Sequence, residues 1–202
     1  MNADTETLSG PACYQLLTGA VVPRPIAWIS TLSSEGIPNL APFSFFTVAS
    51  VYPPVLAVTQ VNPRNKPEKD TLVNVRATRE CVVNVVSHAL LTEMNISSGE
   101  YPAGVNEFEI AGLDRIASQR VNAPGVTQAP VRFECRLREI ITVGTTPSAG
   151  QMMLLDVVHF SVDDRCLNGE TIDSRLLDAI GKLGGDGYST TRDRLDLARP
   201  QV

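Results

Sequence analysis

Residues 22–32 read Val-Pro-Arg-Pro-Ile-Ala-Trp-Ile-Ser-Thr-Leu, and this stretch decides the expected fold. The run from Ile26 to Leu32 is rich in β-favouring residues and follows two prolines, which is typical of a strand. The next four residues, Ser33-Ser34-Glu35-Gly36, predict a turn that leads to a second strand from Leu40 to Val48. A third apolar run, Val55 to Val61, follows the Pro53-Pro54 break. This part of the chain is therefore predicted to form consecutive β-strands.

The remaining sequence adds strands and a few helices. Apolar residues at helical spacing predict a short helix over 68–78, and residues 8–18 predict a short helix or turn. Further strands are predicted from Cys81 to Val86, from Val131 to Gly144 and from Met152 to Val162, the last two as a hairpin. Short helices and loops are expected over 88–116, and a loop and tail from Leu183 on. The pattern predicts a mainly β protein, a β-barrel with peripheral helices.

Length and composition favour one globular domain over residues 1–202. The chain has 202 residues, of which 43% are hydrophobic and 19% charged, proportions that exclude a disordered chain. Its formal net charge of −5 argues against a nucleic-acid partner. The first 23 residues contain no Lys or Arg, which predicts no secretory signal. No apolar run reaches the roughly 18 residues of a membrane span, so a cytoplasmic protein without a membrane partner is expected.

The usual catalytic and metal-binding motifs do not occur. The four cysteines are widely separated and the chain has only two histidines, so no metal site is expected. There is no GxGxxG, no GxxxxGK[ST] and no GxSxG sequence. An enzyme without these motifs would take its chemistry from a bound cofactor.

Three polar clusters would suit one kind of ligand, a phosphorylated planar molecule. They are Arg24 with Ser30 and Thr31, the run 39–46, and Arg64 with Lys69-Asp70-Thr71. A phosphate group binds cations, hydroxyls and the N–H groups at a helix start, which the third cluster would supply. A flat heterocycle binds between apolar walls and backbone polar groups, which the strand through Ala41 to Phe46 would supply.

The runs 22–31, 39–46 and 69–72 also resemble the flavin reductase-like, FMN-binding split-barrel family. That family includes flavoredoxin and the reductase components of two-component flavin monooxygenases. Residues 84–87, 107–113 and 184–189 extend the match, which covers about residues 14–190. The resemblance implies a six-stranded split barrel, usually a homodimer, with FMN in a groove near the dimer interface. The cofactor-binding residues expected on one or both of these grounds are Arg24, Ser30, Thr31, Ala41, Pro42, Phe43, Ser44, Arg64, Lys69, Asp70, Thr71 and Tyr188. Arg64 is expected from its chemistry alone and Tyr188 from the resemblance alone.

The resemblance further implies a histidine of a late strand near the nicotinamide, and His159 is the candidate. The chain departs from many relatives just before this position, where it has Leu155-Asp156-Val157 in place of Gly-Glu-Val. Because hydride transfer needs no side-chain acid or base, the role expected for His159 is to orient the nicotinamide.

Each of these residues also has a structural interpretation. Arg24 is consistent with a turn arginine, Ser30 and Thr31 with ordinary strand residues, and His159 with a hydrogen-bonded core histidine. Lys69-Asp70-Thr71 is consistent with a solvated helix start. The phenylalanines at 43, 45 and 46 are consistent with core packing.

The leading functional hypothesis is an FMN-dependent oxidoreductase that transfers hydride from NADH or NADPH to flavin. A monooxygenase or another electron acceptor would then be its partner. The alternative is an FMN-binding electron carrier without a nicotinamide site. A third hypothesis is a binding module that has lost FMN, and the intact Lys69-Asp70-Thr71 argues against it.

Overall fold

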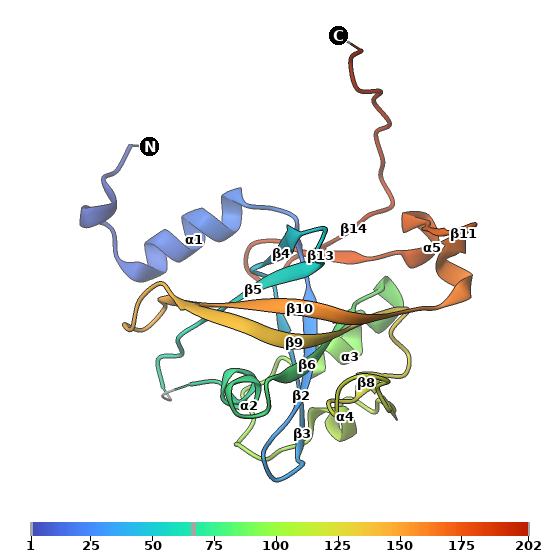
Figure 1. The fold of residues 1–202 in the computed structure, drawn as a ribbon. Helices are drawn as coiled ribbons and strands as arrows, with labels where there is room; N and C mark the ends of the chain where they lie inside the picture. The colour runs from blue at the N-terminus through green and yellow to red at the C-terminus, as the bar shows by residue number, and fades with distance from the viewer. Residues whose placement is uncertain (1, 66–67, 202) are drawn as a thin grey trace.

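The structure is a computed structural model that describes residues 2–65 and 68–201. The helices are α1 (Gly10–Ala20), α2 (Asp70–Thr78), α3 (Leu91–Ile96), α4 (Glu107–Ile110) and α5 (Ser174–Leu177), with 3₁₀ turns at Thr5–Thr7, His88–Leu90 and Asp164–Cys166. The longer strands are β2 (Ala27–Leu32), β3 (Pro38–Phe43), β4 (Phe46–Ser50), β5 (Val55–Val61), β6 (Glu80–Val85), β9 (Val131–Thr142) and β10 (Gly150–Val162). The shorter strands are β1 (Arg24–Pro25), β7 (Arg115–Ile116), β8 (Gly125–Val126), β11 (Leu167–Asn168), β12 (Thr171–Ile172), β13 (Ile180–Lys182) and β14 (Tyr188–Thr190). The expected mainly β architecture with peripheral helices is confirmed (Figure 1).

The seven longer strands form one antiparallel sheet in the order β3-β2-β6-β9-β10-β5-β4. Strands β3 and β4 are at opposite ends of this order, yet only Ser44 and Phe45 separate them in the chain. The sheet must therefore curl until its two ends meet, which makes a barrel that is split between β3 and β4. The strand predicted from Leu40 to Val48 is broken at this point, because β3 pairs with β2 whereas β4 pairs with β5. This break is why seven strands stand where six were expected.

The interior of the barrel is mainly apolar, and helix α2 closes one end of it. Strand residues that alternate inward, such as Ile29, Val58 and Leu155, are fully buried in one cluster. Leu72 and Val75 of α2 join the same cluster with no exposed surface. Packing these two side chains against the barrel fixes the position of the helix start. The first residues of α2 also line a surface cavity.

A second apolar layer lies outside the sheet, under α3 and α4. Trp28, Leu40, Met94 and Phe108 are its large members. The indole N–H of Trp28 donates a hydrogen bond of 2.8 Å to the Ser97 hydroxyl, which ties β2 to the end of α3. This layer holds the segment after α3 against the open edge of β3.

The C-terminal part of the described chain adds a small sheet of order β1-β13-β14. The prediction of loop and tail from Leu183 on is corrected here, because Tyr188–Thr190 pairs with Ile180–Lys182. Beyond this strand the chain runs away from the body of the molecule (Figure 1).

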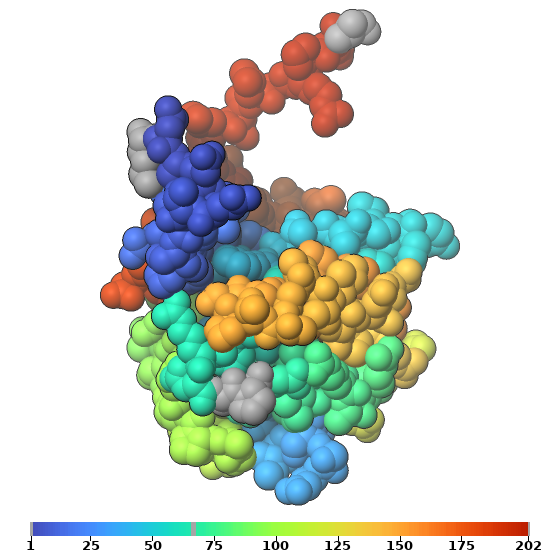
Figure 2. All heavy atoms as spheres, turned by 90° about the vertical axis from the view of Figure 1, so that its left-hand side faces the viewer, coloured from blue at the N-terminus to red at the C-terminus, as the bar shows by residue number. Residues whose placement is uncertain are grey.

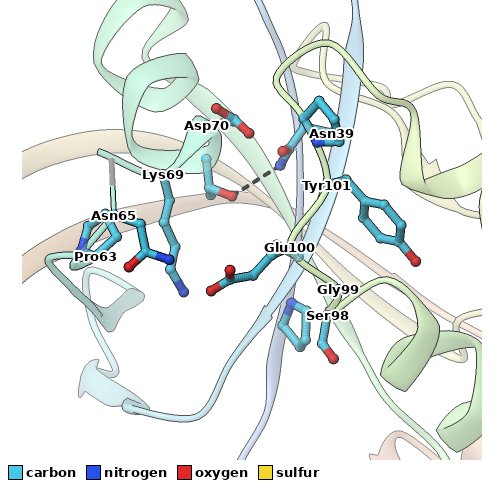
Figure 3. Close-up of a pocket in the computed structure, with 13 residues that line it drawn as sticks. Asn39, Pro63, Asn65, Lys69, Asp70, Ser98, Gly99, Glu100 and Tyr101 are labelled. Carbon is cyan, nitrogen blue, oxygen red and sulfur yellow. Dashed lines mark hydrogen bonds between the residues drawn. The ribbon is translucent and has the colours of Figure 1, made fainter. Parts of the chain in front are cut away.

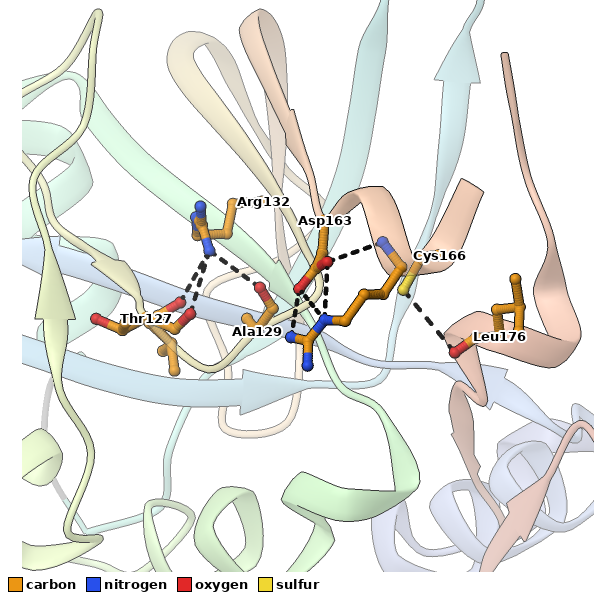
Figure 4. Close-up of polar contacts among 8 residues, drawn as sticks. Thr127, Ala129, Arg132, Asp163, Cys166 and Leu176 are labelled. Carbon is orange, nitrogen blue, oxygen red and sulfur yellow. Dashed lines mark hydrogen bonds and ion pairs between the residues drawn. The ribbon is translucent and has the colours of Figure 1, made fainter. Parts of the chain in front are cut away.

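Polar contacts fix the chain where β10 leaves the barrel (Figure 4). Asp163 accepts hydrogen bonds from the backbone and side chain of Arg165, and these bonds lower the pKa of its carboxyl group to about 2. Nearby, the Arg132 guanidinium donates to the Ala129 carbonyl at 3.0 Å, and the Cys166 thiol contacts the Leu176 carbonyl at 3.8 Å. Burial raises the pKa of Cys166, so this thiol has no character of an activated nucleophile.

No helix of residues 2–65 and 68–201 is long and apolar enough to cross a membrane.

Candidate functional site

Three adjoining cavities form one groove along the outer edge of β3. The first has a volume of about 440 Å³ and reaches the start of α2. The second, about 160 Å³, shares Pro42 and Ser98 with the first. The third, about 480 Å³, shares Ser98, Lys182 and Tyr188 with the second. The groove therefore runs from α2, past the end of β3, to the β13–β14 hairpin.

The α2 end of the groove contains Lys69, Asp70 and Thr71 in its wall. Lys69 is the N-cap residue of α2 and has extended backbone, with φ −85° and ψ 149°. Its ammonium group lies 5.5 Å from the centre of the Phe43 ring, and Figure 3 shows the side chain directed into the cavity. The Thr71 hydroxyl accepts a hydrogen bond of 3.0 Å from the Asn39 side-chain amide. A cation and a helix start in one wall favour an anionic group at this end.

The middle of the groove is lined by the last residues of β3. Ala41 and Pro42 line the first cavity, and Phe43 and Ser44 join Pro42 in the second. Because β3 is an edge strand, its backbone groups on one side have no strand partner. Leu40 directs its N–H to that side, where Glu107 Oε2 accepts it at 2.9 Å. Backbone groups alternate along a strand, so the Pro42 carbonyl faces the same side and offers a polar contact to a flat ring.

The far end of the groove is formed by Lys182 and Tyr188, which are opposite each other in β13 and β14. The Lys182 ammonium lies 4.2 Å from the centre of the Tyr188 ring and donates to the Gly187 carbonyl at 3.2 Å. The Tyr188 hydroxyl donates to Asn95 Oδ1 at 3.1 Å. Burial lowers the pKa of Lys182 and raises the pKa of Tyr188, so the phenol stays neutral at pH 7.

Arg24 lies behind the groove and does not line it. It is buried, and its guanidinium donates to the carbonyls of Thr18 and Val21 at 2.7 Å each and of Leu183 at 2.9 Å. Its Nε atom is 3.3 Å from the Ser44 hydroxyl. These contacts favour the structural interpretation of Arg24, as a brace that joins both walls of the groove.

Ser30 and Thr31 are also withdrawn from the groove, with no exposed surface. Ser30 donates to the Pro124 carbonyl, and Thr31 accepts a bond of 3.0 Å from the Asn74 amide. The reason is that β2 lies inside the sheet between β3 and β6 and is covered on both faces. The structure therefore does not favour direct contact between these two residues and a ligand in the groove.

His159 and Arg64 stand apart from the groove as well. His159 is on β10 opposite Glu134, partly buried, next to a bulge in the strand, and lines none of the three cavities. Arg64 is exposed and precedes Asn65, which does line the first cavity.

Several lining residues were missed from the sequence, and three examples are informative. Asn65 and the loop 98–102 line the first cavity, and Lys182 lines the second and third. The glycine-rich run around 181–187 was a signal for Lys182. The loop carries no motif, and only the packing of α3 brings it to β3.

The curled sheet with its open edge at β3 defines a class of protein, the split barrels. Residues 19–180 match the family model described as flavin reductase like domain, and the chain belongs to this family. The matching segment contains β3, α2 and the loop after α3, and so most of the groove.

Two proteins of known structure and one sequence relative are similar to the chain over most of its length. The chain is similar to nitrilotriacetate monooxygenase component B from Bacillus cereus, with a TM-score of 0.93 and 29% identity over 98% of both chains. It is also similar to the 2-nitrobenzoate 2-nitroreductase NbaA from Pseudomonas fluorescens, with a TM-score of 0.88 and 30% identity, covering 99% of this chain and 96% of that chain. An uncharacterized protein of Aquifex aeolicus (strain VF5) is 42% identical over 179 residues, covering 89% of this chain and 90% of the relative. The comparisons support an oxidoreductase of the flavin reductase type.

Proposed function

We propose that the protein is an NAD(P)H:flavin oxidoreductase that binds FMN in the groove along β3. The observation that carries the proposal is the order of groups in this groove. A cation and a helix start stand at one end, an apolar wall with backbone polar groups in the middle, and an open cavity at the other end. A phosphate, a flat ring and a second planar molecule would fill these three parts in turn.

Several residues of the groove support FMN as the ligand. Lys69 and the first turn of α2 would hold the phosphate by charge-assisted contacts. The Pro42 carbonyl would orient the ring edge, with Phe43 and Met94 as part of its apolar surroundings. When bound, FMN supplies the redox chemistry, since its ring accepts a hydride equivalent from a reduced nicotinamide.

The cavity beside Lys182 and Tyr188 would receive the nicotinamide next to the proposed ring position. In such a site the protein's contribution is to hold two rings in contact and to exclude water, because hydride transfer needs close approach of about 3–3.5 Å between the reacting atoms. The electrons would then pass to a monooxygenase or to another acceptor.

Anaerobic mixing tests the reductase activity. We expect NADH or NADPH to bleach the absorbance of the FMN-loaded protein within seconds. His159→Ala is a useful second protein. If His159 orients the nicotinamide, loss of its side chain raises the apparent nicotinamide constant without changing FMN affinity. Because His159 lines none of the three cavities, we expect this constant to stay unchanged. If both nucleotides leave the flavin oxidised for many minutes, the protein is the electron carrier and the reductase proposal falls.

The protein would form a homodimer with a second copy of the chain. Val51 and Tyr52 at the β4–β5 turn are 84% and 96% exposed, and Leu17 on α1 is 61% exposed. Figure 2 shows the N-terminal helix and the β4–β5 segment standing out from the barrel. Protruding apolar side chains of this kind favour contact with another protein surface, and two-fold dimers are the commonest closed assembly.

Light scattering checks the dimer. The expected mass is twice the 21.8 kDa of the chain. A monomer in solution would contradict the proposed dimer.

A further inference from the structure

The cavity at the start of α2 has an unexpected charge balance for a phosphate site. Among the described residues that line it, the charged side chains are Lys69, Asp70 and Glu100, one cation and two carboxylates. A phosphate monoester carries a charge between about −1.5 and −2 at pH 7. The wall therefore contains groups that attract this phosphate and groups that repel it.

The two carboxylates are placed differently in the cavity (Figure 3). Asp70 is in the first turn of α2 and its carboxylate lies away from the Lys69 ammonium. Glu100 comes from the opposite wall, and its carboxylate is directed toward the end of the Lys69 side chain. Glu100, rather than Asp70, therefore shares the space that a phosphate bound to Lys69 would occupy.

The loop that carries Glu100 is held in place by its neighbours. The Tyr101 hydroxyl donates to the Ile96 carbonyl at 2.9 Å. The Tyr101 ring lies so close to Gly99 that a Cβ atom at Gly99 would be 2.8 Å from it. The Gly99 N–H donates to the Ile96 carbonyl at 3.2 Å. These contacts fix the backbone on both sides of Glu100, while its side chain remains exposed.

We propose that Glu100 determines how tightly the groove holds the phosphate end of the flavin. The inference rests on the proposed function and deepens it. A carboxylate that extends toward Lys69 from this held backbone weakens the binding of a phosphate dianion and leaves an uncharged flavin unaffected.

The test measures the affinities of FMN and riboflavin for the wild type and for Glu100→Gln by quenching of flavin fluorescence. Glutamine has nearly the same size without the charge. We expect the dissociation constant of FMN to fall by about three- to tenfold, as for the loss of one repulsive charge in a part-exposed site. The constant of riboflavin should stay unchanged.

Two control variants separate local from general charge effects. Glu100→Asp keeps the charge and should retain a weaker FMN affinity than Glu100→Gln. Glu170→Gln removes the same charge from the turn between β11 and β12, outside the groove, and should leave both flavins unaffected.

Other results would overturn the inference. If Glu100→Gln binds FMN as the wild type does, or tightens FMN and riboflavin equally, Glu100 does not act on the phosphate, and the proposed function stands. If neither flavin binds to any of these folded proteins, the proposed function falls and the role of Glu100 falls with it.

Discussion

Replacing Arg24 with methionine should lower the free energy of unfolding by about 2–5 kcal/mol, because one buried and two part-buried carbonyls lose their donor at once. The guanidinium donates hydrogen bonds of 2.7 to 2.9 Å to the carbonyls of Thr18, Val21 and Leu183. Methionine fills much of the same volume but donates no hydrogen bond. Urea denaturation monitored by tryptophan fluorescence would measure the change through the single, buried Trp28.

The same variant should weaken FMN and riboflavin to a similar extent. Arg24 connects Ser44, at the middle of the groove, with Leu183, next to Lys182 at its far end. Without this brace the two walls are less well positioned, and the effect does not depend on a phosphate. Arg24→Lys is the matched control for charge, and it should remain destabilised because one ammonium group cannot reproduce the fork. An unchanged stability with a loss confined to FMN would instead place Arg24 in contact with the phosphate.

Arg24 also shows where sequence reasoning reaches its limit. A single arginine between two prolines indicates a fixed position but not the partner. Its partners come from residues 18, 21, 44 and 183, which only the folded chain brings together. Ser30 and Thr31 present the same problem, since burial on both faces of β2 follows from the strand order.

Local signals were more informative. The acidic residue and threonine at the start of the 68–78 segment predicted a helix start, and α2 begins at Asp70. The strand from Val55 to Val61 was predicted with its observed bounds. The break at Ser44 and Phe45 was not, because the residues on both sides favour strands and only the pairing partners change.

The second large effect is expected for Lys69→Ala, which should weaken FMN by about 1.5–3 kcal/mol, roughly 10- to 150-fold, through loss of a charge-assisted contact. Riboflavin has no phosphate and should bind almost as well to the variant as to the wild type. Arg76→Ala is a suitable control, because it removes a cation from the same helix where it pairs with Glu68 outside the groove. Arg64→Ala tests the other cation predicted for this site and should have a smaller effect, since Arg64 is exposed and does not line the cavity.

The most direct test of the account is the preference of the protein for FMN over riboflavin, measured by fluorescence titration of the wild type and of Lys69→Ala. The groove predicts that the wild type binds FMN with low-micromolar affinity or better, about −8 kcal/mol at 1 μM, and prefers it to riboflavin. It also predicts that this preference largely disappears in Lys69→Ala. Equal affinities of the wild type for FMN and riboflavin would contradict a phosphate site at the start of α2.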